Sequence, residues 1–233
     1  MISNTYALGI DLNNWHACHN LVLGGTLPSP EFLGLFSPGL VRQSVRSVSL
    51  DELITGKVEI GVISPRFASR VLAPIAINGA LDKTGTIEIA FEETRRKIAP
   101  EAASRLCCIW LAEDTVDGRA HIQKMFNDVP ALYIIRVRIL ECLRLTRANT
   151  GWFDRYFKYP DQDFIRNYWE DVDCANHGWE FLLEGRIQAI ESSEIAHIKK
   201  LGAKCTPPNY SGASLDEIIA KTRQVQHLES RNE

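Results

Sequence analysis

Residues 132–140 (LYIIRVRIL) have the clearest strand pattern in the chain. From Ile135 onwards, apolar residues alternate with Arg136 and Arg138, and alternation with a period of two is typical of a β-strand. Both arginines are therefore expected on one face of this strand. The segments on either side are shorter and less regular.

Two other apolar segments predict strands, at residues 58–64 (VEIGVIS) and 106–111 (LCCIWL). The segment 179–190 (WEFLLEGRIQAI) is apolar with a Glu-Gly break, which predicts a strand, a turn and a second strand. Residues 24–38 are rich in Gly, Pro and Ser and predict a loop. The strands are short and do not alternate regularly with helices.

Apolar spacing, charge order, acidic first turns or capping residues predict helices elsewhere in the chain. These helices cover residues 87–98, 118–126, 164–170 and 215–227. The last one follows a capping box that begins at Ser214. The mixture of elements indicates the α+β class. We expect one domain at residues 1–200, and a linker with a C-terminal helix at residues 201–233.

Composition excludes several classes of protein. The 233 residues are 45% hydrophobic and 24% charged, with a net charge of −3, which is ordinary for a soluble globular protein. We find no apolar run of the ~18 residues that a membrane span needs and no secretory signal. The six cysteines are scattered, so we expect reduced thiols and a cytoplasmic location.

Charge is uneven between two neighbouring segments. Residues 136–158 hold six bases and two acids, whereas residues 161–191 hold eight acids and two bases. The two segments could be solvated surfaces that pair with each other, or a basic lip beside an acidic catalytic strand. Trp152, Phe153 and Tyr156 lie among the bases, which suits a nucleic-acid strand as well as core packing.

A few residues have side chains suited to catalysis or to binding metals. His16, Cys18 and His19, or Cys174 with His177, offer zinc-ligand types, but neither spacing matches a standard pattern, so we expect no metal. Cys107 and Cys108 lie in an apolar run, where a thiol is inert. No phosphate-cradling glycine loop and no G-x-S-x-G motif is present. Glu180 begins an apolar strand, where a carboxylate either faces a cleft or is an ordinary surface acid.

Four motifs in order carry a family resemblance: residues 91–96 (FEETRR), 104–111 (SRLCCIWL), 168–169 (YW) and 180–186 (EFLLEGR). Their order resembles a bacterial family grouped with the ADP-ribosyltransferase-like fold, which shows an F-E-x-x-R helix, a P-S-R turn, a Y-W pair and an E-x-L-x-x-G strand. The likeness covers residues 91–190. Ala103 replaces the proline of the turn, and the N-terminal part matches poorly.

The resemblance implies a split β-sheet that binds NAD as co-substrate in a cleft. Cleavage of the nicotinamide–ribose bond passes through an oxocarbenium-like transition state, as glycoside cleavage does. Glu180 matches the catalytic carboxylate that stabilises this charge. Ser104 and Arg105 match the motif that supports the ribose and the phosphates, where an arginine fork binds phosphate oxygens in pairs.

Two further NAD-binding positions follow from the resemblance. His16 would be the first motif residue, on a strand and turn formed by residues 15–24. Tyr168 or Trp110 would stack on a ring of the ligand, although either would equally serve as core.

The implied activity is that of a mono-ADP-ribosyltransferase acting as a toxin, a defence component or an effector. Its acceptor would be a nucleic acid, slightly favoured by the basic segment, or a protein. A non-catalytic module that binds a nucleotide or a partner, and an NAD glycohydrolase, are the alternatives. The C-terminal helix would pack on the domain or dock an antitoxin or regulatory protein.

Overall fold

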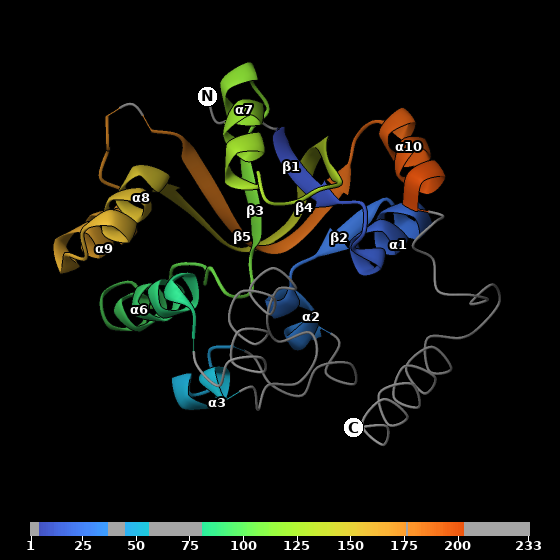
Figure 1. Ribbon diagram of the computed structural model, residues 1–233. Helices are drawn as coiled ribbons and strands as arrows, with labels where there is room; N and C mark the ends of the chain where they lie inside the picture. Colours follow the sequence, from blue (N-terminus) through green and yellow to red (C-terminus); the bar gives the residue numbers. More distant parts are fainter. Residues whose placement is uncertain (1–4, 37–44, 56–80, 176, 203–233) are drawn as a thin grey trace, which may run out of the picture.

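The computed structural model describes residues 5–36, 45–55, 81–175 and 177–202 (Figure 1). The strand predicted at residues 58–64 and the helix predicted at residues 215–227 lie outside the described residues. No helix in the described part of the chain has the length and apolar character needed to cross a membrane. The described elements belong to the α+β class, as the sequence predicts.

The described strands form one antiparallel sheet in the order β2-β5-β3-β1-β4. They are β1 (Tyr6–Asp11), β2 (Thr26–Pro28), β3 (Ile109–Glu113), β4 (Leu132–Asn149) and β5 (Trp179–Ala189). Strand β4 pairs with β1 through its first third, residues 132–137, and with β5 along most of its length. The pairings of β5, β3, β1 and β4 therefore close into a ring.

Strand β5 is continuous, so the predicted turn at its Glu-Gly break is wrong. Gly185 lies beside a bulge in β4, and a Cβ added to it would be 2.2 Å from the backbone oxygen of Glu141. The glycine therefore allows close approach of two strands rather than a change of direction. The predicted alternation along β4 is confirmed, with Arg136 and Arg138 exposed on one face.

The described part of the chain also contains eight helices, most of them in the connections between strands (Figure 1). They are α1 (Trp15–Gly24), α2 (Pro30–Phe36), α3 (Leu50–Ile54), α6 (Lys83–Ile98), α7 (Val116–Met125), α8 (Thr150–Lys158), α9 (Gln162–Trp169) and α10 (Ser192–Gly202). The predictions at residues 87–98, 118–126 and 164–170 are confirmed by α6, α7 and α9.

Two further predictions about local structure are wrong, and the strand predicted at residues 106–111 is confirmed as β3 but starts later. Residues 15–24 form helix α1 instead of a strand and turn, because Asn14 caps its start and Gly25, at φ 63°, ends it. The segment 24–38 is not simply a loop, since β2 and α2 lie within it. The strand predicted from residue 106 begins at Ile109, and Cys107 and Cys108 lie buried in the turn before it.

The sheet has a separate core on each face. Helices α6, α7, α8 and α9 pack on one face, around Trp110 and Leu182. Helices α1 and α10 pack on the other, around Phe181 and Leu183. Figure 1 shows α8 and α9 to the left of the sheet, α7 above it and α6 at the lower left, with α1 and α10 to the right. Side chains alternate along β5, so Glu180 and Leu182 point toward the four-helix layer, away from Phe181 and Leu183.

A buried ionic network joins α6 to β5. Both oxygens of Glu92 accept hydrogen bonds from Arg95, at 2.9 and 2.7 Å, and each of these side chains is 1% exposed. Ser104 donates its hydroxyl to Glu92 at 2.8 Å and its backbone N–H to Glu184 of β5 at 2.7 Å. Buried charges are tolerated only when paired in this way.

Glu92→Ala is expected to lower the free energy of unfolding by about 3–5 kcal/mol, because it leaves the buried Arg95 guanidinium without its carboxylate. Urea denaturation followed by circular dichroism measures the change. Glu93→Ala is the matched control, since Glu93 is the next residue of the same helix and is exposed. Its effect should stay within about 0.5 kcal/mol. An equal loss in both variants would contradict the role of Glu92.

Acid should remove part of this stabilisation. Burial raises the pKa of Glu92, but hydrogen bonds from Arg95, Arg96 and Ser104 outweigh it and hold the pKa below the usual 4.5. A carboxyl with a lowered folded pKa stabilises the fold above its unfolded pKa and loses that contribution as the pH falls through the folded value. Below pH 4.5, unfolding free energy should therefore fall more steeply in the wild type than in Glu92→Gln. Parallel curves would exclude this explanation.

Candidate functional site

Glu180 is the second residue of β5 and is only 1% exposed. It pairs in register with Ala148 of β4 and shares the face of β5 that carries Leu182 and Glu184. Its side chain therefore points into the layer of helices α6 to α9. Of the two alternatives for an acid at this strand end, a surface acid is excluded by the burial.

Arg105 holds Glu180 in place. One guanidinium nitrogen, Nη1, donates to Oε1 of Glu180 at 2.6 Å and to the hydroxyl of Tyr168 at 2.5 Å. The other two nitrogens bind Glu88 of α6, at 2.8 and 3.0 Å. Tyr168 in turn donates to the same Oε1 of Glu180 at 2.5 Å. Four of the five N–H groups of a guanidinium are thereby engaged.

Aromatic rings surround the Arg105 guanidinium. The ring of Phe153 is centred 4.5 Å from it and that of Tyr168 5.2 Å, while Phe91 and Trp110 each lie at 5.8 Å. Burial alone would lower the pKa of Arg105, but Glu88, Tyr168 and Glu180 raise it well above its ordinary value. The guanidinium is therefore charged and fixed at any physiological pH.

Tyr168 stays protonated in this environment. Burial is the largest cause and raises the pKa of its phenol well above the usual 10.0, and Glu180 raises it further, against the opposing effect of Arg105. A protonated phenol can donate to Glu180 while it accepts from Arg105. Tyr168 is therefore a positioning residue for the carboxylate, and its ring lies in the core beside Phe91.

A cavity of about 220 Å³ opens beside Glu180. It is lined by residues of α6, β3, α7, α8 and β5, including Glu88 and Arg105. Trp110 and Phe153 contribute aromatic surface to it. The second carboxylate oxygen of Glu180, Oε2, is buried and has no hydrogen-bond partner among the residues that the structure describes. A buried carboxylate oxygen without a partner is costly, which marks it as available to a ligand.

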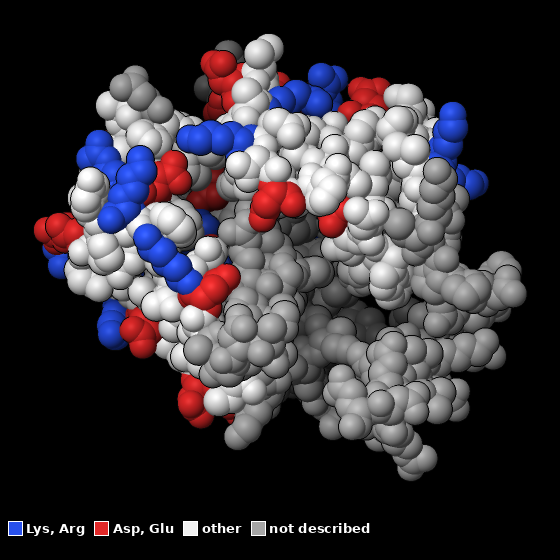
Figure 2. Space-filling view, viewed as in Figure 1, with Lys and Arg blue, Asp and Glu red and all other residues white. Residues whose placement is uncertain are grey.

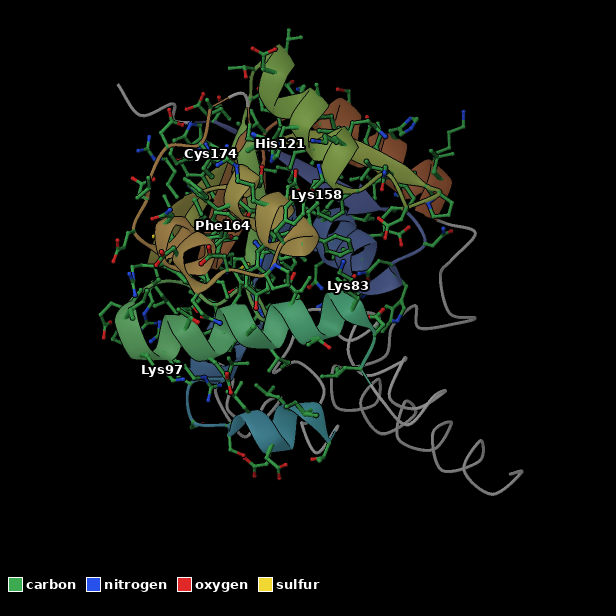
Figure 3. The ribbon with its side chains drawn as sticks, turned by 60° about the vertical axis from the view of Figure 1, so that its left-hand side comes forward. Lys83, Lys97, His121, Lys158, Phe164 and Cys174 are labelled. Atoms are coloured by element: carbon green, nitrogen blue, oxygen red, sulfur yellow. The ribbon has the colours of Figure 1, made fainter. Side chains whose placement is uncertain are left out.

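His121 of α7 lines the same cavity and was not among the residues predicted from the sequence. Its ring lies against Gly178, where an added Cβ would be 2.4 Å from Nδ1. Figure 3 shows His121 on α7, above α8. A single histidine in a short predicted helix belongs to no motif, so only the fold could bring it to Glu180.

Two predicted NAD-binding residues lie away from this cavity. The hydroxyl and backbone N–H of Ser104 are engaged by Glu92 and Glu184, so Ser104 belongs to the ionic network. His16 is exposed on α1, beside Asn20 and Trp15, and α1 packs on the opposite face of the sheet. The structure thus brings Arg105 and Tyr168 to Glu180 but not Ser104 or His16.

The basic and acidic segments pair with each other in part. Three of the six bases, Arg136, Arg144 and Arg147, form ion pairs with acids of the second segment. Arg144 binds Glu184 at 2.9 Å, and Arg147 binds Asp171 at 2.8 Å. Figure 2 shows basic and acidic side chains interspersed over the region of α8 and α9 rather than a continuous basic face. The first alternative for these segments, mutual pairing, is observed for these three bases.

The cysteines also agree with the sequence prediction. The five that the structure describes, all except Cys205, are free thiols. Burial raises the pKa of Cys107 and Cys108 well above the usual value of a thiol. Neither is a nucleophile in this state.

The fold and cavity define an α+β protein with a buried, arginine-held carboxylate between its sheet and a layer of helices. A family model described as "Protein of unknown function (DUF2441)" matches residues 75–196, more than half of the chain. The chain belongs to this family. The matched range includes Glu88, Arg105, His121, Tyr168 and Glu180. No curated protein gives a significant match.

Tyr168→Phe tests the hydrogen bonds around Glu180. We expect the free energy of unfolding to fall by about 1–3 kcal/mol, because one donor of Arg105 and one acceptor site of Glu180 lose a buried partner. Chemical denaturation measures the loss. Tyr159→Phe, at a tyrosine that is 74% exposed, is the control and should be neutral. A neutral Tyr168→Phe would show that the hydroxyl does not hold the cluster together.

Proposed function

We propose that the protein is an NAD-dependent mono-ADP-ribosyltransferase in which Glu180 is the catalytic carboxylate. The observation that carries this proposal is the buried Oε2 of Glu180, which has no partner among the described residues and borders a cavity. The order of motifs in residues 91–190 supports the same activity.

The charge of the cluster suits the reaction. Two buried carboxylates, Glu88 and Glu180, surround one guanidinium, Arg105, so the three groups together carry an excess of negative charge. The nicotinamide ring of NAD is cationic, and the ribose becomes cationic as the glycosidic bond breaks. Fixed negative charge beside the developing cation lowers the barrier, and Trp110 and Phe153 add aromatic faces that favour cations.

The size of the cavity limits what it holds. Sites for whole ligands usually measure about 300–1,000 Å³, and this one is about 220 Å³. It therefore fits one end of NAD, the nicotinamide and its ribose, while the remainder would lie outside. Glu180 would bind the ribose hydroxyl through Oε2, and nicotinamide would leave with the electron pair of the broken bond.

Arg105 takes a different part from the one that the resemblance implies. Its hydrogen bonds to Glu88, Tyr168 and Glu180 leave little of its fork for a pyrophosphate. We assign it the positioning of Glu180. Lys124 lines the same cavity, is 74% exposed and lies 3.7 Å from the partly exposed carboxylate of Asp154. It is less enclosed than Arg105, so we assign it contact with a phosphate.

The acceptor is a nucleic acid or a protein. The basic segment slightly favours a nucleic acid, although several of its arginines are paired with carboxylates. Action in the cytoplasm as a toxin, a defence component or an effector remains part of the proposal. An NAD glycohydrolase, with water as acceptor, would use the same carboxylate.

Glu180→Gln should reduce nicotinamide release from NAD at least about 100-fold, because the amide has the same shape but lacks the charge that stabilises the transition state. Purified wild type and variant are incubated with NAD, and nicotinamide is measured by chromatography. Glu191→Gln is the control, since Glu191 lies just beyond β5 and is half-exposed.

A second measurement identifies the acceptor. NAD labelled in its adenylate half is added with a bacterial lysate, and label is sought in RNA, DNA and protein. Tight NAD binding without nicotinamide release in the wild type would favour the non-catalytic module, and release without labelled macromolecules would favour the glycohydrolase. Full activity of Glu180→Gln would overturn the assignment of Glu180.

A further inference from the structure

Among the described residues around the cavity, His121 and Glu180 each combine a group capable of proton transfer with a buried atom that has no hydrogen-bond partner. Both line the cavity, one from α7 and the other from β5. The Nε2 atom of His121 and the Oε2 atom of Glu180 are buried, and neither has a hydrogen-bond partner among the described residues. Buried polar atoms of this kind are rare in folded proteins and mark a place where a ligand completes the hydrogen bonding.

We infer that His121 is a second catalytic residue, the base that removes the proton from the acceptor while Glu180 stabilises the ribosyl cation. This inference rests on the proposed function. It also narrows the acceptor to one that must lose a proton, such as a hydroxyl, an amino or an amide group. A carboxylate or phosphate acceptor would need no base.

Glu180 and His121 have different roles in the proposed reaction because their surroundings differ. Glu180 is held through Oε1 by Arg105 and Tyr168, so it is a fixed negative charge aimed at one place. No residue in the described part of the chain binds Nε2 of His121. Its ring rests against the backbone at Gly178, two residues before Glu180, so the segment that positions the carboxylate also positions the imidazole.

The groups around His121 favour its neutral form. Burial is the largest cause and lowers its pKa below the usual 6.5, and Lys124 of α7 and His177 from the segment before β5 lower it further. Glu180 of β5 and Asp154 of α8 oppose this shift. Glu88 and Arg105, which also line the cavity, pair with each other. A neutral imidazole has one nitrogen with a free lone pair, which a general base requires.

The proton and electron balance is complete without a further reactant. The bond between the nicotinamide nitrogen and the ribose carbon breaks, and its electron pair leaves with neutral nicotinamide. The acceptor oxygen or nitrogen supplies the pair for the new bond to that carbon. Its proton passes to Nε2 of His121 and then to solvent.

His121→Ala tests this assignment. Transfer of label from NAD to lysate macromolecules should fall about 100- to 10,000-fold, the usual contribution of a general base, and added imidazole should restore part of it. Where water proves to be the only acceptor, nicotinamide release is compared instead. His197→Ala, on the exposed side of α10, is the matched control and should keep wild-type activity.

Two further measurements separate catalysis from structure. Wild-type transfer should be lost as the pH falls through the lowered pKa of His121, below 6.5, and His121→Gln should lack this step. Gly178→Ala adds a Cβ at the position of the imidazole, so it should reduce transfer as well.

An inactive wild type would overturn the proposed function itself. An active wild type with full transfer by His121→Ala, or a loss that imidazole does not restore and an unchanged pH profile, would overturn the role of His121 alone.

Discussion

Two consecutive residues, Ser104 and Arg105, connect helix α6 to strand β5 at the centre of the molecule. Arg105 bridges Glu88 and Glu180, and Ser104 bridges Glu92 and Glu184. The paired acids are four residues apart in each element, and this spacing places both on one face of a helix and also on one face of a strand. Removing the Arg105 side chain would take from buried Glu88 the ion-pair partner that the structure describes for it and leave Glu180 with Tyr168 alone, which is costly for a buried carboxylate.

The two acids of β5 in this arrangement, Glu184 and Glu180, differ in their hydrogen bonding. Glu184 has both oxygens engaged, by the Ser104 backbone and by Arg144, and is fully buried. Glu180, on the same face of the same strand, has one oxygen engaged and one directed to a place without a described partner. A carboxylate with hydrogen bonds to both oxygens stabilises the structure, whereas one with a buried oxygen that lacks a partner is available to a ligand. Burial alone does not distinguish them.

The sequence predicts those helices and strands whose own residues follow a clear pattern of apolar side chains or charges. The alternation in residues 132–140 located β4, and the charge order of residues 87–98 located α6. Strand β1 was missed, because Gly9 interrupts its short apolar run. That glycine lets α7 pack closely on the sheet, since an added Cβ would be 2.9 Å from Ile122. Tertiary contacts of this kind leave no trace in local periodicity.

The candidate site was predicted only where a motif covered it. The motifs supplied Glu180, Arg105 and Tyr168, and the structure brings these three together. Glu88 is 17 residues from Arg105 and His121 lies outside the motifs, so neither could be assigned before the fold was known. His16 was misplaced because its segment is a capped helix on the opposite face of the sheet.

The elements that line the cavity differ in how many of their side chains are buried in the core. Strand β5 is buried along most of its length, whereas α7 contributes one buried side chain, Ile122, among its ten residues. Local opening costs least where few side chains are buried. Helix α7 is thus expected to separate most easily, so its amide hydrogens should exchange with solvent sooner than those of β5. Access to the buried carboxylate would then depend on fluctuations of the helix that carries the histidine.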